Sequence, residues 1–116
     1  SRSYYLVYRI MANTYTNAKL DVTTTNATVL YTADSLTTSI IKSILVSEDS
    51  GNADTVTLTL TNGSTVYSLF KTKAIGANAT VELLTAPIVL QPTEILKVAA
   101  ATANRLHVVA SILEIT

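Results

Sequence analysis

Between Thr55 and Thr61, threonine alternates with an aliphatic residue at every position, and the dipeptide Asn62-Gly63 follows directly. A period of two places the threonines on one face of a strand and the aliphatic residues on the other. Asn-Gly is the strongest short hairpin signal, because both residues tolerate the positive φ angles of a type I′ turn. We therefore expect a β-hairpin here, with Ser64–Thr72 as its second strand.

Similar alternating runs recur along the chain and are separated by polar, glycine- or proline-containing turns. We expect nine strands, at Ala18–Thr23, Thr28–Thr32, Thr38–Ser47, Thr55–Thr61, Ser64–Thr72, Ala79–Leu84, Ile88–Leu90, Glu94–Ala100 and Leu106–Ile115. Their spacing predicts an all-β fold, an antiparallel β-sandwich or jelly-roll-like barrel of eight or nine short strands. A helix competes only over Glu94–Ala103, where the period of two favours a strand. The main turns are expected at Asp49–Asn52 and, in the loop Lys73–Asn78, at Gly76.

Two of these strands are apolar on both faces. In Thr38–Ser47, strict alternation places Ile40, Ile44 and Val46 on one face and Ile41 and Leu45 on the other, with Lys42 interrupting the first. In Leu106–Ile115, the two faces carry Leu106, Val108, Ala110 and Ile112, and Val109, Leu113 and Ile115. Such strands lie centrally in a sheet, covered on both faces or in contact with a neighbouring subunit.

The 116 residues suffice for one domain, and we assign residues 11–116 to a single β-sandwich. Only 14% of the residues are charged, against roughly 25% in typical soluble domains, which suggests that another subunit covers part of the surface. Residues 1–10 are rich in tyrosine and β-prone. They are either an added arm or an extension upstream of a natural start at Met11, where the net charge would be −2 (6 basic against 8 acidic residues).

Composition argues against several classes of function. With 8 basic and 8 acidic residues, no basic stripe is present to follow a phosphate backbone, so we expect no nucleic-acid partner. No apolar run approaches the roughly 20 residues of a membrane helix, and no signal peptide is recognisable, so no membrane association is expected. The absence of cysteine excludes disulfides and thiolate metal sites.

Chemistry-bearing residues are few. His107 is the only histidine and has aliphatic neighbours, which favours a structural or surface role over a general base. Glu48, Asp49 and Asp54 surround a Ser-Gly-Asn turn, but their spacing does not match a calcium-binding loop, which favours a solvated turn. No nucleotide-binding or nucleophile motif is present. The sequence therefore predicts no catalytic, cofactor-binding or metal-binding residue, no cofactor, and a protein that is not an enzyme.

One stretch of the chain resembles a known family. Thr28–Ala33, then Thr37–Ser47, then Glu48–Leu60 follow the order of elements in small β-sandwich structural proteins of tailed bacteriophages, including marine and cyanobacterial phages. In that group a Leu-Tyr-Thr strand leads into an Ile-Ile-Lys-Ser-Ile strand and a Ser-Gly-Asn-type turn. The similarity runs from about Met11 to Thr116, although Ala33-Asp34-Ser35 stands where proline or glycine is expected.

This resemblance implies a virion structural protein, with capsid decoration (cement) as the first choice. Such a protein would bind the major capsid protein or other virion proteins and self-associate, with a trimer favoured. A tail, baseplate or fibre-base component is the alternative within the same class. A receptor- or carbohydrate-binding module, which would depend on Tyr31 or Tyr67, is the alternative from another class.

Overall fold

The computed structural model describes residues 12–116, which form nine β-strands and no helix in that range. The strands are β1 (Asn13–Asp21), β2 (Thr28–Thr32), β3 (Thr38–Glu48), β4 (Asp54–Asn62), β5 (Thr65–Ile75), β6 (Thr80–Glu82), β7 (Ile88–Leu90), β8 (Ile95–Ala100) and β9 (Leu106–Ile115). The all-β prediction is confirmed, and β8 is a strand, as its period of two indicated. The expected arm at residues 1–10 lies outside the described residues. Residues 12–116 hold no helix long and apolar enough to cross a bilayer.

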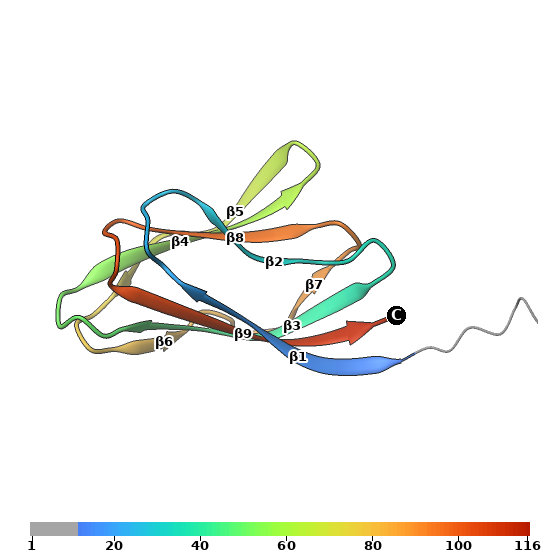
Figure 1. Ribbon diagram of the computed structural model, residues 1–116, viewed down its shortest axis with the longest axis horizontal. Coiled ribbons are helices and arrows are strands. Elements are labelled where there is room, and N and C mark those ends of the chain that lie inside the picture. The colour runs from blue at the N-terminus through green and yellow to red at the C-terminus, as the bar shows by residue number, and fades with distance from the viewer. Residues whose placement is uncertain (1–11) are drawn as a thin grey trace, which may run out of the picture.

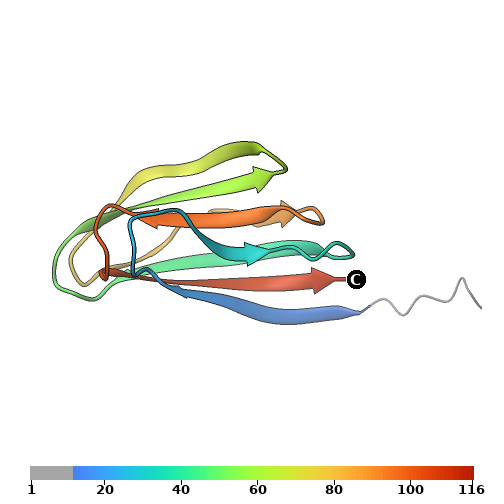
Figure 2. The ribbon, with the colours of Figure 1, turned by 45° about the horizontal axis from the view of Figure 1, so that its top comes forward.

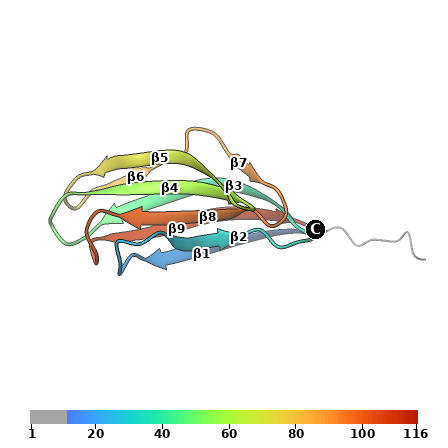
Figure 3. The same cartoon turned by 90° about the horizontal axis from the view of Figure 1, so that it is seen from above.

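The strands form two antiparallel sheets that pack face to face (Figure 1). The five-stranded sheet has the order β1-β9-β3-β6, and β7 also pairs with β3, next to β6 along the same edge. The four-stranded sheet has the order β2-β8-β4-β5. Figure 2 shows β9 between β1 and β3, and Figure 3 shows the four-stranded sheet from above.

The pairing is nested along the chain. β1 pairs with β9, β2 with β8, β3 with β6 and β7, and β4 with β5. Successive pairs fall in alternate sheets. Within the five-stranded sheet, β9 also pairs with β3, and within the four-stranded sheet, β8 also pairs with β4, so each sheet is continuous. A long hairpin wound in this way is a jelly roll. The predicted jelly-roll-like sandwich is therefore the observed topology.

The core lies between the two sheets. Inward-facing side chains of β3, β9, β4 and β8 supply most of it, and the largest that are fully buried include Ile41, Ile44, Leu58, Leu96 and Ile112. Burying one such side chain contributes roughly 1.5–3 kcal/mol. Each sheet packs one face against the other sheet to form the core, and its second face lies on the outside of the sandwich.

The predicted division of β3 into two faces is wrong, because a β-bulge interrupts the strand. Ile41 pairs with Ile112 and Ser43 with Ser111, so Lys42 is an extra residue with no partner on β9. A bulge of this kind shifts the alternation by one residue. Ile41 and Ile44, expected on opposite faces, both point into the core, while Leu45 is exposed together with Lys42.

The hairpin between β4 and β5 forms, but its turn differs from the expected one. Asn62 pairs with Thr65, so the two-residue loop is Gly63-Ser64. Of these, only Gly63 has a positive φ, at 60°, and Asn62 has none. Glycine at the first loop position is the pattern of a type II′ turn, whereas type I′ needs a positive φ at both positions. The glycine, and not the asparagine, therefore sets the turn.

Other strand boundaries also differ from the predicted ones. β1 begins at Asn13, earlier than expected, and β5 continues to Ile75 through residues assigned to a loop. The following turn has its positive φ at Asn78 (57°) and not at Gly76. Thr61 departs from the other threonines of β4, which are half-buried: it is buried, and its hydroxyl has no hydrogen-bond partner among the described residues.

Candidate binding surface

The outer face of the five-stranded sheet is the most distinctive surface of the described chain. We call it the outer face; it carries the side chains that point away from the core on β1, β9, β3, β6 and β7. The strand registers arrange these side chains in rows that run across the sheet. Because directly opposed residues in a sheet have neighbouring side chains, each row acts as one continuous strip.

The apolar row crosses four strands. Tyr15 of β1 lies opposite Leu113 of β9, Leu113 lies opposite Ile40 of β3, and Ile40 lies opposite Val89 of β7. Tyr15 is 73% exposed and Val89 51% exposed, while the two central residues are partly covered. Four adjacent apolar side chains, two exposed and two partly exposed, form a patch of the kind that marks interaction sites.

The mixed row lies four residues away from the apolar row along β1 and β9. Lys19 lies opposite Val109, Val109 opposite Leu45, and Leu45 opposite Glu82. Val109 is 38% and Leu45 40% exposed. The row therefore has a cation at one end, an anion at the other, and two aliphatic side chains between them.

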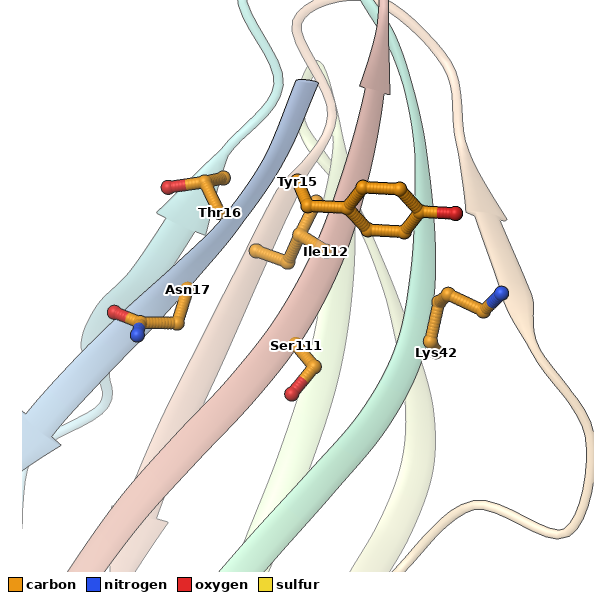
Figure 4. Close-up of a pocket in the computed structure, with 6 residues that line it drawn as sticks. All are labelled: Tyr15, Thr16, Asn17, Lys42, Ser111 and Ile112. Carbon is orange, nitrogen blue, oxygen red and sulfur yellow. The ribbon is translucent and has the colours of Figure 1, made fainter. Parts of the chain in front are cut away.

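A polar row separates these two. It contains Asn17, Ser111 and Ser43, with the bulge residue Lys42 beside them. The Lys42 ammonium lies 6.0 Å from the centre of the Tyr15 ring. Figure 4 shows that ring extending from β1 across β9 toward β3, with the Lys42 side chain next to it. The two side chains border an open hollow over the polar row; the cation–π contact is worth about 0.5–1 kcal/mol at such an exposed site.

Backbone donors hold the Glu82 carboxylate on this face. Its Oε2 accepts hydrogen bonds from the N–H groups of Ile44 (2.8 Å) and Leu84 (3.1 Å), and Oε1 accepts one from the Ser43 hydroxyl. Partial burial alone would raise the pKa of this carboxyl, but the hydrogen bonds outweigh it and lower the pKa below its ordinary value. Glu82 therefore presents a fixed negative charge at the β6 edge.

His107 lies at one end of the outer face, between two aspartates. Its Nε2 is 3.1 Å from Oδ1 of Asp21, and its Nδ1 is 3.2 Å from Oδ2 of Asp49. The imidazole is about half exposed and links the end of β1 to the turn after β3. Within residues 12–116 no three His, Asp or Glu side chains are arranged to hold a metal ion. The geometry gives His107 a surface position with both ring nitrogens against carboxylates.

The expectation of a solvated turn is wrong for Glu48 and Asp54, and it fits only Asp49, which is exposed. Glu48 is 2% exposed, and its carboxylate accepts hydrogen bonds from the N–H groups of Ser50 (2.8 Å), Gly51 (3.1 Å) and Asn78 (3.0 Å) and from the Ser50 hydroxyl. Burial alone would raise the pKa of Glu48, but these donors lower the pKa to about 2.

Asp54 is also buried and structural. Its two oxygens accept hydrogen bonds from the N–H groups of Thr55 (2.8 Å) and Thr102 (3.3 Å), which ties the start of β4 to the loop after β8. Together, Glu48 and Asp54 satisfy backbone donors that would otherwise be left unpaired where strands end. Both carboxylates are thus occupied by the protein's own backbone.

Tyr31 links the two sheets. Its hydroxyl, on β2, is 2.7 Å from the Ser39 hydroxyl of β3 and donates to the Glu114 carboxylate of β9. Burial, together with the Glu114 carboxylate, raises the pKa of Tyr31 to about 12. This side chain holds the sandwich together and is not a free stacking platform, whereas Tyr67 on β5 is exposed.

Sequence reasoning found some residues of the outer face but not their arrangement. It identified Val109, Leu113 and Ile115 as a second apolar face of the last strand, and these are exposed or partly exposed. It did not find the Lys19–Glu82 row, because that row depends on the pairing of four strands separated by up to 90 residues (Lys19 to Val109). No match was found among protein-family models, and a search of curated proteins also found none.

Proposed function

We propose that the protein is a structural component of a bacteriophage virion, most specifically a capsid-decorating protein that binds the shell through non-catalytic contacts. The observation that carries this proposal is the outer face, where a row of apolar side chains lies exposed or partly exposed on the sheet. The resemblance of residues 28–60 to small phage β-sandwich proteins is the reason for proposing a phage virion as the particle that the protein binds. Jelly rolls serve in viral capsids but also in lectins and cupins, so the fold by itself does not decide the function.

The chemistry of the described residues fits a binding role. Glu48, Asp54 and Tyr31 engage the protein's own backbone or side chains. The outer face combines uncovered aliphatic and aromatic side chains with a few charges, which is the composition of a recognition surface.

The test is localisation on purified particles. We expect peptides of this chain in virions purified on a density gradient, at a copy number comparable with that of the major shell protein. Antibody labelling should then decorate the shell. Label confined to the tail would contradict capsid decoration in favour of a tail or baseplate component, and absence of the chain from washed particles would contradict the virion assignment.

A further inference from the structure

The outer face carries a charge pattern that matches itself. Lys19 and Glu82 stand at opposite ends of the mixed row, three strand spacings apart, with Val109 and Leu45 between them. A surface with a cation on one side and an anion on the other, around an apolar middle, can bind a rotated copy of itself.

We propose that the outer face binds the outer face of a second copy of this chain, about a two-fold axis that runs along the strands between β9 and β3. The inference rests on the proposed function in that the same face is taken as the assembly surface; a second copy covers this face, and the pair contacts the shell through its remaining surfaces. The partner is a second copy of this chain, and the axis determines which residues of the two outer faces lie opposite each other.

A two-fold axis in this direction exchanges β9 with β3 and β1 with β6 and β7, while it keeps every row at its own height. Lys19 of each copy then lies opposite Glu82 of the other, so two equivalent ion pairs form. Val109 lies opposite Leu45 in the same row. In the apolar row, the backbone position of Tyr15 lies opposite that of Val89, and Leu113 lies opposite Ile40. The Tyr15 ring extends over β9 toward β3, so it packs between the central residues of the two copies, and the exposed apolar side chains of both rows face one another.

The polar row is accommodated as well. Lys42 lies toward the β6–β7 side of β3 (Figure 4), so in the paired arrangement it lies opposite Asn17 of the other copy, whose amide oxygen can accept from the ammonium. The serines of β9 and β3 lie opposite each other. No charged side chain of these three rows is left facing an aliphatic one.

The other face-to-face two-fold axis, perpendicular to the strands, is disfavoured. It would exchange the apolar and mixed rows and keep each strand opposite itself. Glu82 would then lie opposite Val89 in both copies, and the carboxylate of neither copy would meet an ammonium. Desolvating a carboxylate against an aliphatic side chain is costly, so the charges select the axis along the strands.

The size of the face suits a reversible dimer. Three strand spacings of about 4.8 Å, and four steps of about 6.8 Å along the strands from the residues opposite Ile115 to those opposite His107, give a projected area of roughly 400 Å² per copy. Side-chain relief increases the accessible area, so pairing buries on the order of 1,000 Å² in total, at the low end of specific interfaces. We therefore expect an association that dilution reverses. This two-fold pair differs from the trimer that the family resemblance favours, and the two are told apart by mass.

The first experiment is sedimentation equilibrium of the full chain between about 1 and 200 μM. We expect a monomer–dimer equilibrium that Lys19→Glu weakens at least tenfold, because both ion pairs become like-charge contacts. Lys71→Glu, at an exposed position on the other sheet, makes the same charge change and should leave the equilibrium unchanged. A monomer at every concentration, a trimer, or equal effects of the two variants would overturn the proposal.

The second experiment fixes the register. The chain contains no cysteine, so Tyr15→Cys/Val89→Cys introduces a unique pair at two exposed positions. Within one chain these positions are three strands apart, too far for a disulfide; across the proposed axis they face each other. Mild oxidation should give a covalent dimer, and neither single variant should crosslink as fast. Equal crosslinking of a single variant would overturn the proposed axis.

The two proposals can fail separately. A monomeric protein that is nevertheless found on purified particles would overturn the pairing and leave the virion role standing. A protein that dimerises through this face and is absent from particles would do the reverse.

Discussion

The carboxylate of Glu48 joins two turns that lie far apart in the chain. It accepts from Ser50 and Gly51 in the turn after β3, and from Asn78 in the turn after β5. Because its folded-state pKa of about 2 lies below the ordinary 4.5, the charged form is favoured by folding. The stability that results is fully present above pH 4.5 and is lost as the pH falls toward 2.

Glu48→Gln should therefore lower the urea midpoint at pH 7, because an amide cannot accept four hydrogen bonds as a carboxylate does. It should also flatten the dependence of stability on pH between about 4.5 and 2. Urea unfolding at pH 7, 4 and 3 measures both effects. The neighbouring exposed carboxylate offers the control Asp49→Asn, which we expect to change little; equal losses for the two variants would contradict the role assigned to Glu48.

Thr93 has a backbone conformation that its side chain disfavours. It follows Pro92 in the turn Gln91–Glu94 and has a φ of 75°, the position where a type II turn prefers glycine. The left-handed region costs a non-glycine residue roughly 1–2 kcal/mol, which the entropy of glycine in the unfolded chain partly offsets.

Thr93→Gly should consequently stabilise the protein by up to about 1 kcal/mol. Thermal or urea unfolding provides the measurement. Thr80→Gly, at an exposed strand position with no positive φ, should instead destabilise the protein by about 0.5–1 kcal/mol. A loss of stability in Thr93→Gly would show that the threonine side chain makes a contribution that outweighs its strain.

At the scale of elements, the bulge at Lys42 determines which residues of β3 are buried. Deleting Lys42 would restore regular alternation and keep Ile41, Ile44 and Val46 pointing into the core. Deleting Leu45 would force either Ile44 or Val46 out of it. We expect the Leu45 deletion to cost at least about 2 kcal/mol more than the Lys42 deletion, as urea unfolding would measure. Equal losses would place the bulge elsewhere.

The same bulge makes the neighbouring residues Ile44 and Leu45 differ in how much each contributes to stability. Ile44→Ala should cost about 2–5 kcal/mol, because Ile44 is fully buried and its truncation leaves a cavity. Leu45→Ala should cost less than about 1 kcal/mol at concentrations where the protein is monomeric. Denaturation at low micromolar concentration compares the two directly, and a large loss for Leu45→Ala would show that its side chain is covered within a single chain.

Much of the element structure could be predicted from alternation and turn residues, since all nine strands appear near their expected positions. The alternation of apolar and polar residues could not predict the β-bulge that interrupts it at Lys42. The run from Ile40 to Val46 is apolar on both faces, so a slip of one residue at Lys42 leaves the pattern looking equally good. The partners of Glu48 were also hidden, because one of them lies 30 residues away in a turn whose place depends on the whole sheet.

The binding surface was predicted only as a tendency. The double-faced apolar character of the third and last strands predicted either cover on both faces or contact with a neighbouring subunit. Within the described chain one face of each lies outside the core, where Leu45 and Val109 are exposed. Its rows could not be read from the sequence, because a row is a property of register. Lys19 and Glu82 become related only when β1, β9, β3 and β6 are aligned.

At the scale of the whole molecule, nested pairing makes nearly every sheet contact long-range. Among the nine strands of residues 12–116, the first pairs with the last, and only β4 with β5 forms a local hairpin. Chains with such topologies refold in milliseconds to seconds, since distant segments must meet before contacts stabilise them. We expect refolding in that range, by stopped-flow circular dichroism or tyrosine fluorescence, as the chain has no tryptophan. Microsecond refolding would contradict this topology.

The position of β9 also affects synthesis. β9 lies between β1 and β3 but follows both in the chain. On a translating ribosome, β1 and β3 emerge with a gap one strand wide between them, and the gap stays open until residues 106–115 leave the exit tunnel. Ile41, Ile44 and Val46 lack their β9 neighbours throughout that interval. A nascent chain arrested before Leu106 therefore cannot close its sheet.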